Sequence, residues 1–204
     1  MVSQSSENGQ ELQVSADAAL KLRKPVVLVG MMGAGKTAVG TALAALLGVP
    51  FLDSDREIEA AANASIAEIF ARDGETFFRD RETEVLTRLL QSVPGILSTG
   101  GGAFLAERNR EVIGRYGVSV WLDADLELLW SRVRHKTTRP LLLTEDPKAT
   151  LSELYNARVP LYAKAQLRVP AAPELSIEQM ARRVRNALAA TPGVLRATDA
   201  ASQG

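Results

Sequence analysis

A glycine-rich segment followed by a lysine and a threonine carries the clearest chemistry in this sequence. Residues 30–37 read GMMGAGKT and fill every fixed position of the pattern G-x-x-x-x-G-K-[ST]. In that pattern the backbone N–H groups of the loop and of the next helix surround phosphate, and glycine lets the backbone come close. Lys36 is expected to reach the β- and γ-phosphates, and the Thr37 hydroxyl to bind Mg²⁺. The pattern predicts a nucleotide site rather than a chance match, because it lies between an apolar run and a helical segment.

Two aspartates follow the next strand-like run, and their carboxylates could act on a metal ion or on a second substrate. Asp53 and Asp55 come directly after Pro-Phe-Leu at 50–52, and side-chain alternation sends both carboxylates to one side. Ligands bind at the carboxyl ends of parallel strands, so both should face the crevice of the phosphate loop. One of them could instead cap the helix that begins near Arg56. A pair of carboxylates suits metal positioning and polarisation of a hydroxyl better.

Three consecutive glycines and three arginines complete the chemically suggestive residues. Gly100, Gly101 and Gly102 follow another strand-like run, where they either form a flexible turn or let the backbone approach a ligand. The arginines at 79, 139 and 158 stand beside aromatic residues or prolines. An isolated arginine is usually a solvated surface charge. These contexts favour a fixed guanidinium that binds carboxylate or phosphate with two hydrogen bonds.

The elements that would position these residues alternate between apolar runs and helical patterns. This alternation predicts an α/β fold with a parallel sheet. The expected strands are 25–29, 50–53, 95–98, 118–122 and 167–169. The expected helices are 37–47, 65–72, 75–91 and 176–189, with capping boxes at Ser65 and Ser176. The polar, strand-poor segment 134–148 interrupts the pattern and is expected to be a mobile lid.

Composition limits the remaining possibilities. A chain of 204 residues favours one domain, expected at 23–190, and zero net charge argues against nucleic acid or an anionic membrane as partner. The absence of cysteine excludes disulfides and thiolate chemistry and fits a cytoplasmic protein. No apolar run approaches the length of a membrane span. Residues 1–22 and 191–204 are expected to be disordered tails, with a short helix at 15–22.

Taken together and in this order, the motifs resemble those of shikimate kinase. The resemblance runs from about residue 26 to residue 188. It implies a P-loop NTPase three-layer sandwich around a five-stranded parallel sheet, and transfer of the γ-phosphoryl group of ATP to the 3-hydroxyl of shikimate in aromatic amino acid biosynthesis. The segments that carry it are GMMGAGKT (30–37), FLDSD (51–55), IFARDGE (69–75) with Phe78-Arg79, the glycines 100–102, RPLL (139–142) and RVPLY (158–162).

The same resemblance implies roles for individual residues. Lys36, Asp55 and Arg139 would be catalytic, with Arg139 closing over the transferring phosphoryl group. Arg79 and Arg158 would bind the shikimate carboxylate, while Asp55 and the glycines would hold ring hydroxyls. One Mg²⁺ ion would be bound by Thr37 and, through water, by Asp53 and Ser98. The ATP-binding set would be Gly33, Ala34, Gly35, Lys36, Thr37, Ala38, Arg132 and Arg139, and the substrate-binding set Asp55, Arg79, Gly100, Gly101, Gly102 and Arg158.

Two alternatives remain open on the residues alone. A gluconate-kinase-like enzyme shares the phosphate loop and the small size, although the glycine triplet and the RPLL segment argue against it. A catalytically inactive binding protein of the same family is the other alternative, and the intact lysine, aspartates and arginines argue against that. We expect a monomer whose partners are ATP and shikimate.

Overall fold

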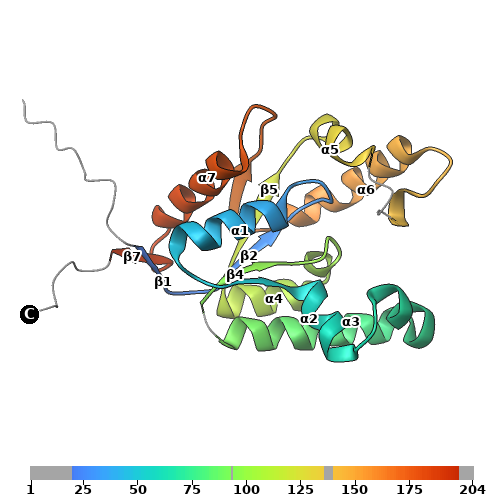
Figure 1. Cartoon of the computed structure of the whole chain (residues 1–204), viewed down its shortest axis with the longest axis horizontal. Helices are drawn as coiled ribbons and strands as arrows, with labels where there is room; N and C mark the ends of the chain where they lie inside the picture. Colours follow the sequence, from blue (N-terminus) through green and yellow to red (C-terminus); the bar gives the residue numbers. More distant parts are fainter. Residues whose placement is uncertain (1–19, 93, 136–139, 198–204) are drawn as a thin grey trace, which may run out of the picture.

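The computed structural model describes residues 20–92, 94–135 and 140–197 (Figure 1). Its centre is a five-stranded sheet in the order β3-β4-β2-β5-β6, and every neighbouring pair is parallel. The strands are β2 (Val26–Val29), β3 (Phe51–Asp53), β4 (Ile96–Ser98), β5 (Val118–Asp123) and β6 (Leu167–Pro170). The sequence-based strand predictions are therefore confirmed to within one residue at each end.

Helices cover both faces of this sheet, which makes three layers. Helices α1 (Lys36–Leu47) and α7 (Ile177–Ala189) pack together on one face, and α3 (Ile66–Ser92) and α4 (Glu107–Tyr116) pack together on the other (Figure 1). All four residues of β2 are buried between these layers, as expected for the middle strand of a parallel sheet. The remaining helices are α2 (Ser54–Ala62), η1 (Ala103–Leu105), α5 (Leu126–Val133), η2 (Pro140–Leu142) and α6 (Pro147–Tyr162).

The predicted helix boundaries follow local chemistry. Ser176 and Gln179 form a reciprocal capping box at the start of α7, and Ser65 with Glu68 does the same before α3. Gly48 ends α1 in the left-handed conformation, at φ 63°. The predicted break near residue 74 is also present, because Gly74 has φ 82° and ψ 173° and divides α3 into two helical segments.

The expectations for the two ends of the chain were wrong where the structure describes them. Leu20–Leu22 forms strand β1 rather than the end of a short helix, and Leu195–Ala197 forms strand β7 within the expected C-terminal tail. The two strands pair antiparallel, with Leu22 opposite Leu195. The reason is tertiary: Leu22 and Val194 are buried in the same core. The local sequence of either short segment does not predict this pairing.

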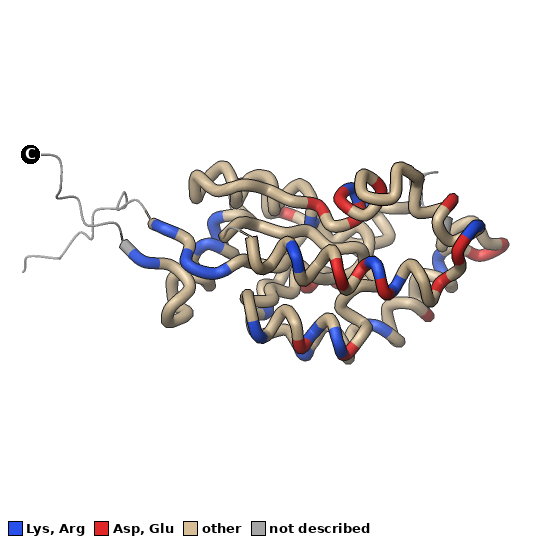
Figure 2. Tube along the Cα trace, turned by 90° about the horizontal axis from the view of Figure 1, so that it is seen from below, with Lys and Arg blue, Asp and Glu red and all other residues tan. Residues whose placement is uncertain are grey.

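The distribution of charged and apolar residues in the structure agrees with the expectations from composition. Figure 2 shows basic and acidic residues interspersed along the helices. Within residues 20–92, 94–135 and 140–197, no helix combines the length and the apolar character that crossing a bilayer requires. The expected lid, 134–148, is described at 134–135 and from residue 140 onward, while Arg139 lies outside the described residues.

Two helical glycines should respond in opposite ways to alanine. A Cβ atom at Gly40 in α1 would lie 2.6 Å from Phe51 Cε2, whereas one at Gly114 in α4 would meet nothing within 4 Å. Gly114→Ala should raise the free energy of unfolding by about 0.5–1 kcal/mol, because alanine is the better helix former. Gly40→Ala should lower it by about 1–2 kcal/mol, because overpacking outweighs that gain. Urea unfolding of both variants tests this, and a stabilised Gly40→Ala would contradict the packing of α1 on β3.

Candidate functional site: a phosphate-loop pocket beside an acceptor cluster

The phosphate loop between β2 and α1 needs glycine for two separate reasons. Gly30 has φ 139°, and a Cβ atom there would lie 2.8 Å from the Leu122 carbonyl oxygen. Gly33 has φ 84°, and its Cβ would lie 2.7 Å from Val133 Cγ1. L-residues rarely adopt such φ values, and neither neighbour leaves room for a side chain. The glycine spacing read in the sequence is therefore a requirement of the turn and of its packing.

Lys36 is the first residue of α1 and its side chain folds back over the loop. Its Nζ atom donates hydrogen bonds to the carbonyl oxygens of Gly30, at 2.8 Å, and Met31, at 3.1 Å. Thr37 follows in the first helical turn, where N–H groups have no partner within the helix. The loop thus presents an ammonium group, a hydroxyl and a helix N-terminus at one place, which is an arrangement that attracts phosphate.

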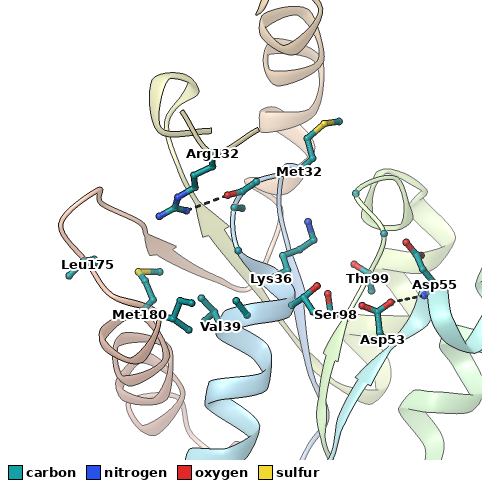
Figure 3. A pocket seen from close by; sticks show the side chains of 18 of the residues that line it. Met32, Lys36, Val39, Asp53, Asp55, Ser98, Thr99, Arg132, Leu175 and Met180 are labelled. Atoms are coloured by element: carbon teal, nitrogen blue, oxygen red, sulfur yellow. Dashed lines mark hydrogen bonds between the residues drawn. The ribbon is translucent and has the colours of Figure 1, made fainter. Parts of the chain in front are cut away.

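A pocket of about 530 Å³ opens above this loop (Figure 3). The loop and α1 form its floor, the ends of β3 and β4 form one side, and the start of α7 forms the other. The lining residues are 32–39, Asp53, Asp55, 98–101, Arg132, Leu175, Ser176, Ile177 and Met180. Sequence reasoning missed the apolar contribution of Met180, which lines the pocket together with Leu175 and Val39 (Figure 3).

Arg132 lies at the rim of the pocket, as expected for a residue near the nucleotide. It comes from the last turn of α5, and its Nη1 atom donates to the Gly33 carbonyl oxygen at 3.3 Å. Figure 3 shows its guanidinium beside the loop, at the end of the pocket away from Asp53 and Asp55. The pocket therefore has a basic rim at one end and a carboxylate rim at the other.

Asp53 caps a helix and also faces the pocket. Its side chain caps α2 by accepting hydrogen bonds from the N–H groups of Asp55, at 3.1 Å, and Arg56, at 3.4 Å. It also lines the pocket, directly opposite Ser98 in the parallel pairing of β3 with β4. The cap holds the carboxylate in place, because two backbone donors orient it. The strand register then brings the Ser98 hydroxyl to the same edge.

The donor atoms at this edge suit Mg²⁺. Thr37, Asp53, Asp55 and Ser98 supply only oxygen atoms, and Mg²⁺ prefers oxygen. The described part of the chain holds no cluster of three or more His, Cys, Asp or Glu side chains around one point. Mg²⁺ is commonly held by one or two carboxylates together with waters and substrate phosphates. The residues present fit an ion bound in that way.

Asp55 is set apart from Asp53 by its surroundings. Burial raises the pKa of the Asp55 carboxyl above its usual 3.8, and the nearby Asp53 carboxylate raises it further, while Lys36 and Arg79 act in the opposite direction. A carboxylate with a raised pKa binds a proton more readily than an exposed aspartate. Asp55 therefore places a carboxyl group with a raised pKa at this end of the pocket.

The glycine triplet brings Asp55 together with both arginines. A Cβ atom at Gly100 would lie 2.7 Å from Asp55 Oδ1, and one at Gly102 would lie 3.0 Å from Arg79 Nη1. At Gly101 the nearest atom would be Arg158 Nη1, at 3.6 Å. Three charged side chains therefore lie beside the triplet, and two of them approach its backbone closely enough to leave no room for a side chain at Gly100 or Gly102. We call Asp55, Arg79, Arg158 and residues 100–102 the acceptor cluster.

Arg79 is held in the acceptor cluster by two glutamates that sequence reasoning missed. Its Nη1 atom contacts both Glu82 carboxylate oxygens, at 3.0 and 3.2 Å, and its Nε and Nη2 atoms contact Glu75 Oε1 at 3.4 and 3.3 Å. Glu82 is only 2% exposed; burial raises its pKa, and the Arg79 guanidinium partly offsets that effect. The spacing i−4 and i+3 around Arg79 was the available signal.

The expected residues thus fall into two adjoining groups. The phosphate-loop residues, Asp53, Ser98 and Arg132 line the pocket, and Asp55, Gly100 and Gly101 belong to both groups. Arg79 and Arg158 lie beside the triplet but are not among the residues that line the pocket. Arg139 falls among the residues that the structure does not describe, so its expected role stays a prediction.

Comparison with known proteins identifies what this arrangement is similar to. Residues 32–189 match the family model described as shikimate kinase. The shikimate kinase of Ruegeria pomeroyi is 68% identical over 87% of this chain and 91% of its own length. The shikimate kinase of Cereibacter sphaeroides is 65% identical over 86% of this chain and 87% of its own length. The solved shikimate kinase of Acinetobacter baumannii, in complex with shikimate, is 41% identical, with a TM-score of 0.74 over 80% of this chain and 91% of that one.

The raised pKa of Asp55 leads to a prediction about stability. A carboxyl group whose pKa is higher in the folded protein favours folding at low pH, and that contribution is lost as the pH rises through the folded pKa. Asp55→Asn removes the ionisation, so the variant should melt at a higher temperature than the wild type at pH 7–8. The difference should narrow as the pH falls toward 3.8. Thermal unfolding of both proteins between pH 4 and 8 measures this difference in melting temperature. An Asp55→Asn variant less stable than the wild type at neutral pH would contradict the raised pKa of Asp55.

Proposed function

Because this chain belongs to the shikimate kinase family, we propose that it transfers the γ-phosphoryl group of ATP to the 3-hydroxyl of shikimate. The products are shikimate 3-phosphate and ADP, and the step serves aromatic amino acid biosynthesis. One observation carries the proposal: the glycine triplet joins a phosphate-loop pocket to a cluster of one carboxylate and two guanidinium groups. A nucleotide and a small hydroxylated acid could then react side by side.

ATP occupies the phosphate-loop pocket in this proposal. The N–H groups of residues 33–38 and the Lys36 ammonium hold its phosphates, as the geometry of the loop supports. Arg132 flanks the base from one side, and the apolar side chains of Leu175 and Met180 offer it a surface on the other. The phosphates and the base are placed in this way because the pocket lining is polar at the loop and apolar near α7.

Thr37 would bind one Mg²⁺ ion directly, while Asp53 and Ser98 would bind it through water. When bound, the ion neutralises charge on the β- and γ-phosphates. Asp53 suits this role because its α2 cap already fixes the carboxylate at the pocket edge. Phosphoryl transfer depends on positioning and on charge stabilisation, so a fixed carboxylate matters more here than a reactive one.

Asp55 aligns and polarises the acceptor hydroxyl. Its carboxylate lies against Gly100 at the junction between the pocket and the acceptor cluster. The raised pKa makes it a good acceptor for the proton of an alcohol. Arg79 and Arg158 bind the shikimate carboxylate from the far side of the triplet, and the N–H groups of the glycines hold ring hydroxyls. The acid is thereby oriented with its 3-hydroxyl toward the phosphates.

Arg139 supplies positive charge to the transferring phosphoryl group in this proposal, and the sequence RPLL at 139–142 supports that role by resemblance.

We also propose that the protein works as a monomer in the cytoplasm. ATP and shikimate are its small-molecule partners. The gluconate-kinase alternative is not favoured, since the similar proteins with high identity are shikimate kinases.

A coupled assay with ATP and either shikimate or gluconate tests the proposed function. Release of ADP should depend on shikimate and on Mg²⁺, and gluconate should give no more ADP than the blank. Activity with gluconate alone would favour the alternative. Binding of shikimate with no turnover at saturating ATP and Mg²⁺ would instead indicate a binding protein.

The carboxylate-binding pair gives a prediction about substrate affinity. Arg79→Ala and Arg158→Ala should each raise the KM for shikimate by about a hundredfold, because each removes a charge-assisted contact to a carboxylate. The KM for ATP should change little. Arg81→Ala is the matched control, since Arg81 lies on the same helix in an exposed ion pair with Glu84. Equal effects of Arg79→Ala and Arg81→Ala on shikimate would refute the assignment.

A substitution at Arg139 separates turnover from binding. Contacts made mainly in the transition state affect kcat rather than ground-state affinity. Arg139→Ala should lower kcat by a factor on the order of 10² or more. Arg139→Lys should recover only part of it, because a point charge does not replace the planar fork. Shikimate affinity without nucleotide should stay at the wild-type value; unchanged kcat with a higher KM for ATP would make Arg139 a nucleotide-binding residue only.

A further inference from the structure

All three carbonyl groups of the glycine triplet are held by hydrogen bonds, but not in the same way. The Gly100 oxygen accepts from the Ala103 N–H at 3.1 Å, and the Gly102 oxygen from the Leu105 N–H at 3.1 Å. Both donors lie within η1, next in sequence. The Gly101 oxygen accepts from the Tyr162 hydroxyl at 2.6 Å, across 61 residues of chain. The middle peptide is thus oriented by tertiary structure alone.

Tyr162 is well fixed for this task. It is the last residue of α6, its side chain is fully buried, and its ring stacks on Trp121 at 6.5 Å between centroids. Burial raises the pKa of the hydroxyl above 10, and the nearby Arg158 guanidinium partly offsets this. The phenol therefore stays protonated at every pH at which the protein would be assayed, and it remains a hydrogen-bond donor.

The same hydroxyl also interacts with Arg158. The two residues are four positions apart on α6, so their side chains lie on one face of the helix. The Arg158 Nη1 atom and the Tyr162 hydroxyl lie 3.6 and 3.7 Å from the position that a Gly101 Cβ would take, so the two groups are neighbours beside the triplet. One phenol oxygen can donate one hydrogen bond and accept another. Tyr162 therefore connects the middle of the triplet with one of the two arginines of the acceptor cluster.

We propose that Tyr162 is a positioning residue for the acid substrate, acting through the Gly101–Gly102 peptide and the Arg158 guanidinium. In a trans peptide the C=O and the following N–H point in opposite directions, so holding the Gly101 oxygen aims the Gly102 N–H. Among the described residues neither the Gly101 nor the Gly102 N–H donates a hydrogen bond. Both are available to an oxygen of a hydroxylated carboxylate. This inference rests on the proposed function and extends it beyond the residues that touch substrate.

Removal of the hydroxyl should loosen the triplet while the phosphate loop and α1 keep their arrangement. Glycine has the widest conformational freedom of any residue, so a Gly101–Gly102 peptide without its donor can rotate. Binding of the acid must then fix both the peptide and Arg158. The loss should appear in affinity for the acid, because the Tyr162 hydroxyl donates to Gly101 and not to the Lys36 loop or to α1. A merely structural role would lower the stability and affect both substrates alike.

The test compares Tyr162→Phe with Tyr155→Phe, a tyrosine two turns earlier on the same helix. Tyr162→Phe should raise the KM for shikimate about tenfold, the equivalent of about 1.4 kcal/mol. Its kcat should stay within about threefold of wild type, as for a lost ground-state contact, and its KM for ATP should not change. Tyr155→Phe should behave like wild type. A KM for shikimate within twofold of wild type, or equal rises for both substrates, would overturn the inference.

A measurement on the unaltered protein tests the contact that the inference requires, a Gly102 N–H that meets the acid, even if Tyr162→Phe folds poorly. With ¹⁵N-glycine labelling, shikimate should shift the Gly102 amide resonance far more than those of the buried Gly95 and Gly117, which pack against Pro50 and Pro25. No selective shift would overturn the inference. Failure of the wild type to phosphorylate shikimate would instead refute the proposed function, so the two failures are distinguishable.

Discussion

The close approach of charged side chains to residues 100–102 is the constraint on which the acceptor side of the site depends. Asp55 from α2, Arg79 from α3 and Arg158 from α6 come from three helices, yet each lies against one glycine of the triplet. A side chain at Gly100 would collide with the Asp55 carboxylate and one at Gly102 would crowd the Arg79 guanidinium. The missing Cβ atoms at Gly100 and Gly102 therefore make room for the Asp55 carboxylate and the Arg79 guanidinium on one short segment of backbone.

Such a gathering of charge is unfavourable for folding unless neighbouring groups offset it. Glu75 and Glu82 do so for Arg79, and the buried Glu82 carboxylate keeps its partner within 3.0 Å. Asp55 has less compensation: burial and Asp53 raise its pKa, and the opposing effects of Lys36 and Arg79 are smaller than that of burial. Groups with shifted pKa values often mark functional sites for this reason. The same desolvation that weakens the fold at Asp55 makes its carboxylate a better acceptor for a hydroxyl proton.

Much of this molecule follows from local patterns. Short-range rules determine the capping boxes at Ser65 and Ser176 and the break at Gly74, because each depends on contacts within a few residues. The buried run at β2 marks the middle of a parallel sheet for the same kind of reason. The strand pair of β1 and β7 could not be predicted in this way. Its two members lie at opposite ends of the chain, and each is three residues long.

The sequence by itself determined which chemistry is present: a phosphate loop with Lys36 and Thr37, the carboxylates Asp53 and Asp55, three glycines and the arginines. Residue type and spacing suffice there, since these groups act through their own atoms or through adjacent backbone. Only the tertiary structure decided that Asp53 lies opposite Ser98 at the pocket, that the three charged side chains gather at the glycine triplet, and that Tyr162 orients Gly101. Those outcomes depend on distances between distant segments and on burial, which arise only when the layers pack.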